Sequence, residues 1–362
     1  MNLYVHVPFC RGKCAYCAFY SEPRFDEGLW NRYLAELECR FATFPGRGEK
    51  ITTLYIGGGT PTLPPVECLK SFFRLFRDSF SFAPDAEISI ECNPETMSPE
   101  KAELLAGFVN RVSMGAQSFS PALLEAIGRT SKDPEKIRSA FRMLRSAGLC
   151  NIGLDLMYAL PGEDMELLKR DLDAALELEP THLSAYSLTL EEGTALAERT
   201  GLSVPSDDLS AEMWEFIGSY TAEILPRYEI SNYAQKEYEC RHNQAVWHGE
   251  RYFGFGPAAC SFDGFRRWTE QASLNGWLAG EKPEEDVIPR ETRLAEIFMM
   301  GLRTVRGWKI SEFEQVTGDS LRCLEKKIAH LEEIGLLLRE GECIRATSEG
   351  LLFWNVIAEE LL

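Results

Sequence analysis

The sequence predicts an α/β protein whose first half is built from six β/α units, and three observations predict this class. Up to about residue 187, short apolar runs alternate with amphipathic stretches of helical spacing. Polar and glycine-rich segments follow these apolar runs. Past residue 190 the alternation stops, and from about residue 290 the pattern is mainly helical. Six β/α units in series imply a parallel sheet with right-handed crossovers, either an open sheet or a partial barrel.

The predicted strands of the first half are apolar runs of five to eight residues. They cover residues 3–7, 51–56, 87–91, 109–114, 151–157 and 181–188. Helices are expected between them, at about residues 26–42 and 65–78 and as a pair between 120 and 147. In the first of these helices, Leu29, Tyr33 and Leu37 recur at helical spacing, which predicts one buried face.

The second half of the chain predicts a different organisation. Helices are expected at residues 207–225, 309–316, 319–334 and 348–361, with an aromatic- and glycine-rich stretch after the first. The hairpin signal LLLREGECIRAT lies between the last two, so helices with a β wing suggest a small winged-helix-like module. Residues 279–291 are the best candidate linker. We therefore expect three regions, covering residues 1–200, 201–285 and 286–362.

Composition narrows the classes of partner. The 362-residue chain is 45% hydrophobic and 26% charged, which is ordinary for a globular protein. Its formal net charge of −18 argues against nucleic acid as a partner, because phosphate binding needs concentrated Lys and Arg. No apolar run is long enough to span a bilayer, and the first residues lack the pattern of a signal peptide. We expect a cytoplasmic protein.

Three of the eleven cysteines, Cys10, Cys14 and Cys17, form a C-x3-C-x2-C cluster. Seven others are scattered through apolar or helical stretches, where we expect small buried hydrophobic side chains. Clustered thiolates bind zinc or an iron–sulfur cluster. Structural zinc usually takes two close cysteine pairs, and no second pair is present. A [4Fe–4S] cube takes one ligand per iron, so three cysteines leave one iron open to another ligand.

The residue types that bind ligands fall at one kind of position in this pattern. They lie at or just past the carboxyl ends of predicted strands: residues 10–17, 57–62 and 91–93, Gln117, Asp155 and Ser187. Parallel α/β sheets and barrels build their active sites at these ends. The sequence therefore predicts that these residues converge on one face.

The segment VPFCRGKCAYCAF after the first strand resembles the cluster loop of the radical S-adenosylmethionine (SAM) superfamily. The motifs YIGGGTPT, IECNPET, RVSMGAQSF, GRTS and IGLDLMYALPG are similar to the branch that contains oxygen-independent coproporphyrinogen III dehydrogenase and the heme chaperone HemW. The resemblance continues through HLSAYSLTLEEGT, CRHNQAVW and ETRLAEIFMMGLRTVRGW, and so covers nearly the whole chain. It implies a partial (β/α)6, TIM-like barrel with a mainly helical, winged-helix-like C-terminal domain.

The resemblance also implies the cofactors and the residues that hold them. A [4Fe–4S] cluster sits on Cys10, Cys14 and Cys17, and its open iron chelates the amino and carboxylate groups of SAM. Arg129 matches the arginine that pairs with the SAM carboxylate. The remaining positions that match SAM-lining residues are Tyr4, Tyr16, Gly58, Gly59, Thr60, Glu91, Gln117, Asp155 and Ser187, with Tyr16 favoured over Tyr4. Each has a structural alternative: a tight glycine turn, a capping carboxylate, a solvated arginine or a core aromatic.

Two departures from the dehydrogenase pattern favour the chaperone. Phe19 stands where the dehydrogenase carries a further cysteine, and the segment before the first strand is short. In CRHNQAVW, His242, Asn243 and Trp247 match the H-N-x-x-Y-W motif implicated in heme binding, with Val246 in place of tyrosine. An imidazole is a natural axial ligand of heme iron, which makes His242 the candidate ligand. Alternatively, this segment is structural and His242 is simply hydrogen-bonded.

Three functions from different classes remain open at this point. The resemblance favours a heme chaperone that binds heme and transfers it to acceptor heme proteins of the respiratory chain, with a homodimer as one oligomeric state. The first alternative is a radical enzyme that oxidatively decarboxylates coproporphyrinogen III. The second is a structural zinc protein that uses the three thiols and a histidine. His6 on the first strand is expected to be a satisfied core histidine.

Overall fold

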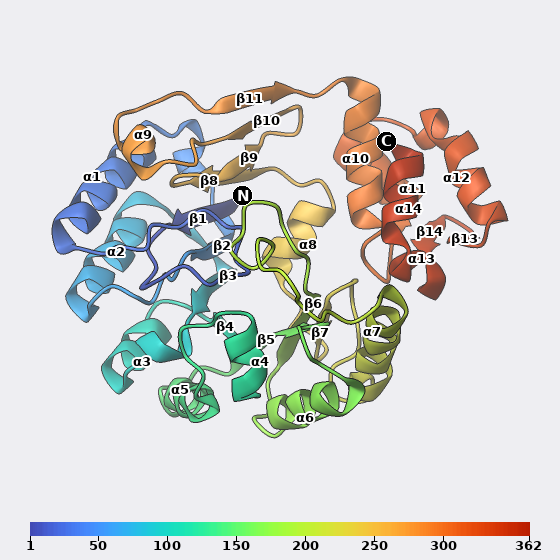
Figure 1. Ribbon diagram of the computed structural model, residues 1–362. Coiled ribbons are helices and arrows are strands. Elements are labelled where there is room, and N and C mark those ends of the chain that lie inside the picture. The colour runs from blue at the N-terminus through green and yellow to red at the C-terminus, as the bar shows by residue number, and fades with distance from the viewer.

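The computed structural model describes residues 1–362 and is built around one eleven-stranded sheet that curves into an open barrel (Figure 1). The strands of this sheet are β1 (Asn2–Val7), β2 (Ile51–Gly58), β3 (Phe82–Cys92), β4 (Arg111–Gln117), β5 (Asn151–Tyr158), β6 (His182–Ser187), β7 (Asn232–Ala234), β8 (Tyr252–Phe255), β9 (Cys260–Phe262), β10 (Arg266–Thr269) and β11 (Glu284–Val287). The first six are the predicted strands, and they pair in parallel in chain order. The predicted partial β/α barrel is confirmed.

Helices connect the parallel strands and cover the outside of the barrel. They are α1 (Glu27–Thr43), α2 (Val66–Ser79), α3 (Pro99–Ala106), α4 (Pro121–Ala126), α5 (Pro134–Ser146), α6 (Met165–Leu176) and α7 (Asp207–Thr221). The predicted apolar spacing explains their packing: α1 buries Trp30, Tyr33, Leu37 and Phe41 against the sheet. Asp26 begins α1 by accepting a hydrogen bond from the Leu29 backbone N–H.

The sheet extends beyond the six predicted strands at both edges. β7 pairs antiparallel with β6, and β8 pairs in parallel with β1 on the other side. β9, β10 and β11 continue that side as an antiparallel meander. The proposed linker at residues 279–291 is therefore wrong in part, because it contains β11. All four side chains of β11 are exposed, so the segment lacks the apolar alternation that would indicate a strand.

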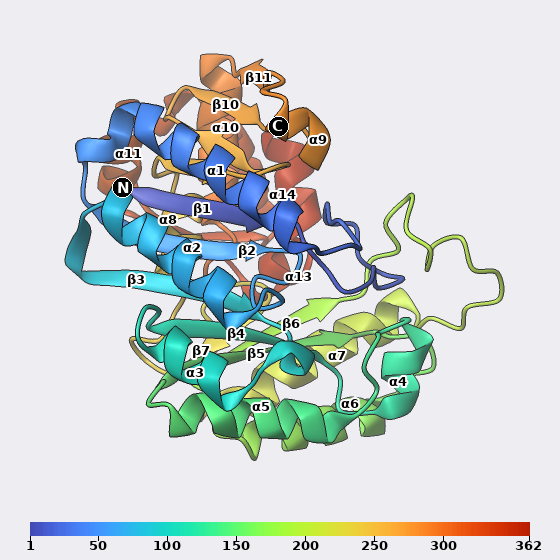
Figure 2. The ribbon, with the colours of Figure 1, turned by 90° about the vertical axis from the view of Figure 1, so that its left-hand side faces the viewer.

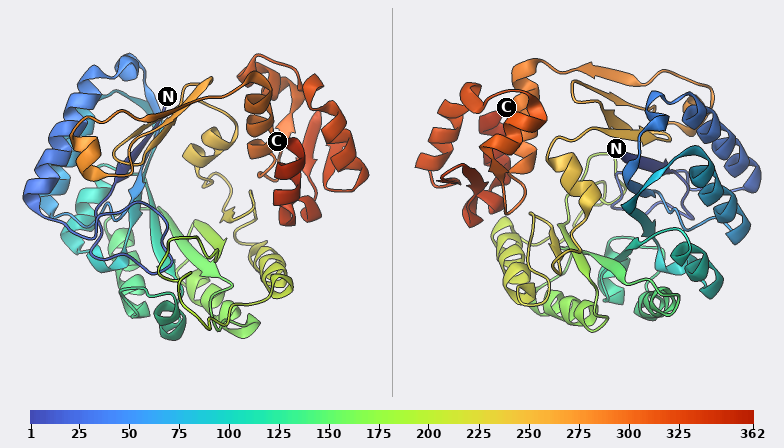
Figure 3. Two further views of the ribbon diagram at one scale, coloured as in Figure 1. Left: turned by 45° about the horizontal axis from the view of Figure 1, so that its top comes forward. Right: turned by 180° about the vertical axis from the view of Figure 1, so that it is seen from behind.

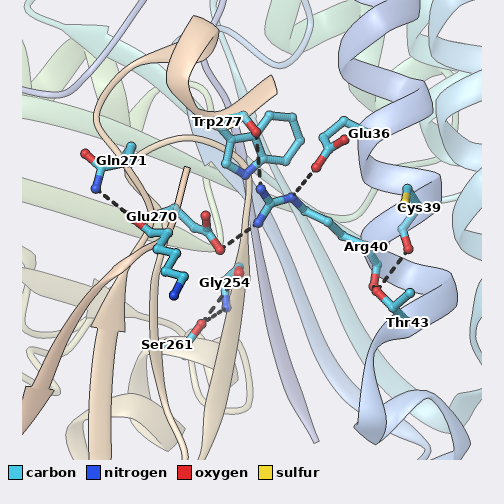
Figure 4. Close-up of polar contacts among 10 residues, drawn as sticks. Glu36, Cys39, Arg40, Thr43, Gly254, Ser261, Glu270, Gln271 and Trp277 are labelled. Atoms are coloured by element: carbon cyan, nitrogen blue, oxygen red, sulfur yellow. Dashed lines mark hydrogen bonds and ion pairs between the residues drawn. The ribbon is translucent and has the colours of Figure 1, made fainter. Parts of the chain in front are cut away.

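Arg40 of α1 ties this sheet extension to the barrel (Figure 4). Its guanidinium donates to Glu36 at 2.7 Å and to Glu270 at 2.9 Å, and also to the backbone oxygen of Trp277 at 3.2 Å. The guanidinium carbon lies 4.7 Å from the centre of the Trp277 ring. Trp277 belongs to α9 (Leu274–Leu278), so one arginine joins the first helix of the chain to a segment more than 230 residues later.

The C-terminal part forms a helical lobe beside the open side of the barrel (Figure 3). It contains α10 (Arg290–Gly301), α11 (Ile310–Thr317), α12 (Glu325–Glu333), α13 (Ser348–Leu352) and α14 (Trp354–Leu361), and a small sheet in the order β12 (Trp308–Lys309), β14 (Cys343–Ala346) and β13 (Leu337–Glu340). The predicted hairpin is present as β13 and β14. The predicted helix 319–334 is a 3-10 turn followed by α12, and the predicted helix 348–361 breaks at Phe353.

The lobe and the barrel share one continuous hydrophobic core, which includes Leu3 of β1, Phe298 of α10 and Leu361 of α14. The helix α8 (Arg241–Trp247) lies between them. The scattered cysteines are less buried than predicted: Cys39, Cys150 and Cys323 are exposed, because they lie on solvent-facing sides of their segments. No helix is both long and apolar enough to cross a membrane.

The carboxyl ends of β1–β6 lie on the same side of the molecule (Figure 2). The loop that carries the three clustered cysteines and the long loop after β6 both project there. This arrangement is the one in which parallel barrels place their active sites.

Candidate functional site

A cavity of about 540 Å³ opens at the carboxyl ends of the parallel strands. Its lining includes most of the residues singled out in the sequence: Cys10, Cys14, Tyr16, Cys17, Gly58, Gly59, Thr60, Glu91, Gln117, Arg129, Asp155 and Ser187. These residues come from six different β/α units, and the curvature of the sheet brings them together. The predicted convergence on one face is present in the structure.

The three clustered thiols lie on the loop between β1 and α1, half-buried at the rim of the cavity. The Sγ of Cys10 lies 3.5 Å from the hydroxyl of Thr60. Burial raises the pKa of both the Cys10 and Cys17 thiols. No three His, Cys, Asp or Glu side chains converge in a way that would hold a single metal ion. A cubane cluster takes one thiolate per iron and so needs no such convergence on one point.

The glycine-rich loop after β2 packs directly against the cysteine loop. The backbone N–H of Gly59 donates to Val7 at 2.8 Å, and that of Thr60 donates to Phe9 at 2.7 Å. A Cβ on Gly59 would lie 2.7 Å from the backbone oxygen of Phe9. The close approach that requires glycine is therefore to the cysteine loop itself, and it fixes Thr60 beside Cys10.

Glu91 occupies the end of β3 and faces the cavity. Its carboxylate accepts hydrogen bonds from the Tyr55 hydroxyl at 3.1 Å and from the Gly58 backbone N–H at 3.0 Å. Burial, reinforced by the nearby charge of Asp155, raises the pKa of Glu91 to about 7. A carboxyl group in this state can accept hydrogen bonds when ionised and donate one when protonated.

Asp155 of β5 is the second carboxylate of the cavity. The hydroxyl of Ser113 donates to its two oxygens, at 2.9 and 3.2 Å. Burial raises the pKa of Asp155 as well. A fixed, buried carboxylate of this kind suits the paired hydroxyls of a ribose, as acidic residues do in dinucleotide-binding folds.

Arg129 follows α4 and returns to the rim of the cavity. Its Nη2 donates to the Gly115 backbone oxygen at 2.6 Å, and its Nη1 donates to the Tyr16 hydroxyl at 3.3 Å. Nη1 also lies 3.9 Å from the Sγ of Cys14. Arg129 is therefore held beside the thiol loop, and is not the solvated helix arginine of the alternative interpretation.

Gln117 reaches the cavity through an irregularity at the end of β4. The pairing register of β4 with β5 shifts between Gly115 and Gln117, and Gln117 has a φ of 70°. A non-glycine residue in this left-handed region is uncommon and occurs often at functional sites. A Cβ on Gly115 would lie 2.9 Å from the Gln117 amide nitrogen, so Gly115 leaves the space that this side chain uses.

Two residues of the sequence analysis do not line the cavity. Tyr4 lies behind the wall, where its hydroxyl contacts His6 Nδ1 at 3.0 Å. His242 is 5% exposed beneath the floor: its Nδ1 lies 2.8 Å from the Thr53 hydroxyl and its ring packs against Tyr55. Burial, together with the charge of Arg111, lowers the pKa of His242 to about 3. The structure therefore agrees with the hydrogen-bonded alternative for His242 in this conformation.

No histidine lines the cavity. His6 is a satisfied core histidine as predicted, with Nε2 2.9 Å from the Tyr20 backbone oxygen. His248 is buried against the C-terminal lobe, where its ring packs on Trp308. Cys240, just before α8, is fully buried.

Several lining residues were not found from the sequence: Tyr55, Arg111, Ser113, Ser184, Tyr186 and Asn232. Most are single polar residues inside apolar strands. Alternation along a strand shows that a residue lies on the polar face, but it does not show whether that face lines a barrel interior or meets solvent. The sequence does contain a signal that could have identified Arg111. A charged residue at the start of a buried strand is rarely found without a partner, so it indicates a bound group or an ion pair.

The residues present fit a cluster and a nucleoside-like cofactor. Three thiols without a fourth, Arg129 beside them and a buried carboxylate deeper in the cavity supply donors for a cluster, a carboxylate and ribose hydroxyls. The cavity volume of about 540 Å³ lies within the usual range for small-molecule sites.

This fold and this site define a radical SAM protein. Comparison with protein families agrees: residues 4–175 match the radical SAM superfamily, and residues 288–353 match the HemN C-terminal domain. Membership of the superfamily implies a [4Fe–4S] cluster and SAM.

Full-length relatives narrow the class. The chain is 33% identical to the heme chaperone HemW of Lactococcus lactis over 371 residues, covering 100% of this chain and 97% of the relative. It is 35% identical to HemW of Bacillus subtilis, covering 98% and 97%, and 31% identical to HemW of Escherichia coli, covering 100% and 98%. The chain therefore belongs to the HemW family.

A solved structure supports the fold. Coproporphyrinogen III oxidase (HemN) from Escherichia coli, a radical SAM enzyme, superposes with a TM-score of 0.85 and covers 99% of this chain and 89% of its own. The sequence identity of 23% is low, so this likeness concerns the architecture of the barrel and the C-terminal lobe.

Proposed function

We propose that this protein is a heme chaperone, which binds heme and transfers it to acceptor heme proteins. The observation that carries the proposal is similarity along the entire chain to relatives named heme chaperone HemW, at 31–35% identity in the three compared above. The acceptors would be heme proteins of the respiratory chain, and the protein would act in the cytoplasm, alone or as a homodimer. The negative net charge of −18 is in keeping with a protein partner rather than a nucleic acid.

In this proposal Cys10, Cys14 and Cys17 hold the [4Fe–4S] cluster, and SAM lies in the cavity beside it. When bound, the cluster offers its fourth iron to the amino and carboxylate groups of SAM. Arg129 would bind the SAM carboxylate, since its guanidinium already stands beside Cys14 and Tyr16. Thr60, Gln117 and the backbone near Gly58 and Ser187 would line the cofactor, and the carboxylates of Glu91 and Asp155 would accept its hydrogen-bond donors.

The rim of the cavity supports binding of a large apolar ring. Phe19 and Tyr186 both line the cavity and are 72% and 42% exposed. Leu190 on the adjoining loop is 41% exposed. Porphyrins stack on aromatic side chains of this kind. Phe19 also occupies the position of the additional cysteine in the dehydrogenase pattern, which favours the chaperone.

The axial ligand of heme is a separate question. His242 remains the candidate from the sequence motif, but its imidazole is buried under Tyr55. Ligation by His242 would require α8 to move away from β2. The exposed histidine of the chain is His330 in α12, on the C-terminal lobe.

The second candidate function is oxidative decarboxylation of coproporphyrinogen III. The observation that favours it is the architecture shared with HemN at a TM-score of 0.85. The two functions use the same cluster and SAM site, so the residues that would hold these cofactors do not separate them. Measurements of heme binding and of coproporphyrinogen III turnover separate the two functions.

An anaerobic heme titration of the cluster-reconstituted protein, followed by Soret absorbance, tests the proposal. We expect saturable binding near one heme per chain. If His242 is the ligand, His242→Ala weakens binding or shifts the Soret band, whereas the matched control His330→Ala does neither. If His242→Ala binds heme as the wild type does, the proposed chaperone function stands and another residue is the axial ligand. Absence of stoichiometric binding in the wild type would rule out the chaperone function.

A further inference from the structure

Arg111 is the first residue of β4, and its side chain reaches into the interior of the barrel. It is 2% exposed and yet lines the cavity. Its one hydrogen bond is long, from Nη1 to the Ser89 hydroxyl at 3.5 Å, and its Nε has no partner. A buried guanidinium usually has a carboxylate partner in a salt bridge, and Arg111 has none.

The carboxylates around Arg111 already accept hydrogen bonds from other groups. Glu87 accepts hydrogen bonds from the backbone N–H groups of Arg241 at 2.9 Å and of His242 at 3.1 Å, and from the Cys240 thiol at 3.7 Å. Higher in the cavity, Glu91 accepts from Tyr55 and Gly58, as described above. Asp155 is held by Ser113. The barrel interior thus contains a cation whose donors remain available.

The remaining neighbours of Arg111 are neutral. Burial, followed by the charge of Arg111, lowers the pKa of His182 well below its ordinary value, and His242 is affected in the same way. Both imidazoles are therefore neutral, and neither attracts nor repels the guanidinium as an ion would. Asn232, Asn243 and Ser184 also line this cavity, and they add amide and hydroxyl groups to its wall.

We propose that Arg111 is the binding site of a carboxylate group, carried by a molecule that occupies the floor of the cavity. A guanidinium presents a planar fork that matches a carboxylate. Glu91 and Asp155 share the same cavity, so a singly charged carboxylate fits better than a multiply charged phosphate. The proposal extends the function proposed above, because it concerns a second group in the same cavity and not the group at the cluster. The carboxylate comes either from a porphyrin propionate or from a small free acid.

Measurements on the wild-type, cluster-reconstituted protein distinguish the two sources. The first compares the affinities for heme and for heme dimethyl ester, in which both propionates are blocked. The second follows the thermal midpoint Tm with increasing sodium acetate, against acetamide and against sodium chloride at equal ionic strength. A ligand that binds only the folded state raises Tm saturably.

If the source is a propionate, heme binds at least about tenfold more tightly than its ester, as expected for a charge-assisted pair. That preference is lost in Arg111→Met and partly kept in Arg111→Lys. If the source is a free acid, heme and ester bind alike, and acetate raises Tm saturably in the wild type but not in Arg111→Met. Arg138→Met is the matched control, since it removes an arginine that lies outside the cavity and pairs only with exposed carboxylates, and it leaves both readouts unchanged.

Two results would overturn the proposal. One is equal binding of heme and ester together with no saturable effect of acetate in the wild type, a result that does not depend on any variant folding. The other is a preference for heme, or an acetate effect, that persists undiminished in Arg111→Met. Failure of heme to bind at all would reject the chaperone function alone, because the acetate measurement would still decide the role of Arg111.

Discussion

At the scale of single residues, the cavity is defined by polar groups that the barrel encloses. Glu91 and Asp155 are both carboxylates with a raised pKa, and each keeps its orientation through hydroxyl or backbone donors. Arg129 is fixed beside the cysteine loop by Gly115 and Tyr16. The site is therefore largely organised by the chain itself, which limits the entropy cost of binding a cofactor.

The raised pKa of Glu91 predicts a pH-dependent stability of the protein without SAM. Below about pH 4.5 the carboxyl is protonated in both states. Between pH 4.5 and about 7 the unfolded chain loses the proton and the folded chain keeps it. The free energy of unfolding therefore falls as pH rises through this window, by at most roughly 3 kcal/mol from this group.

Urea denaturation at several pH values checks this expectation. Glu91→Gln should remove that part of the pH dependence, because the amide does not titrate. The matched control is Glu135→Gln, which removes a carboxylate that is 69% exposed and lies outside the cavity. An identical pH slope between 4.5 and 7 in wild type and Glu91→Gln would contradict the assignment.

Single residues also show what could be predicted from the sequence. The three cysteines, the glycine loop and most of the other predicted positions line the cavity, because residue type and spacing indicate which residues lie at the carboxyl ends of the strands. Tyr4 and His242 were assigned to the site by motif but lie behind its wall. A motif indicates which residues lie near a site. It does not show whether a given side chain faces the cavity or packs in the core behind it.

At the scale of elements, the six parallel strands were predictable because each is an apolar run between polar or glycine-rich segments. The strands β7 to β11 were not, because they are only three or four residues long. Runs that short do not establish a period. Their place in the sheet is decided by tertiary contacts, among which the Arg40 cluster is prominent (Figure 4).

Arg40→Met tests how strongly that cluster anchors the sheet extension. Glu270 is 8% exposed, and its Oε2 already lacks a partner. Loss of Arg40 would leave a buried carboxylate unpaired, and we expect the free energy of unfolding to fall by about 1–3 kcal/mol. Urea denaturation measures this change.

The comparison for Arg40→Met is Arg138→Met. Arg138 pairs with Glu135 and Glu177, whose side chains are 69% and 67% exposed. Exposed pairs of this kind typically contribute less than about 1 kcal/mol. Equal losses in the two variants would show that the Arg40 cluster is not a special anchor.

At the scale of the whole molecule, a continuous core that includes α10 joins the barrel to the C-terminal lobe, and α8 contacts both β2 and α10. Asn243 of α8 lines the cavity, while His248 directly after α8 packs on Trp308 of the lobe. One short helix thus contacts both the ligand cavity and the lobe. The predicted helical module is present, but its contact with α8 was not evident from the sequence, because it joins segments that are far apart in the chain.

The measurement that tests the central claim most directly is heme transfer from the loaded, cluster-reconstituted protein to the apo form of a b-type heme protein. The account predicts that one heme per chain moves to the acceptor, with the Soret band changing to that of the acceptor. It also predicts no conversion of coproporphyrinogen III with SAM and a reductant. Turnover of coproporphyrinogen III without stoichiometric heme binding or transfer would contradict the account.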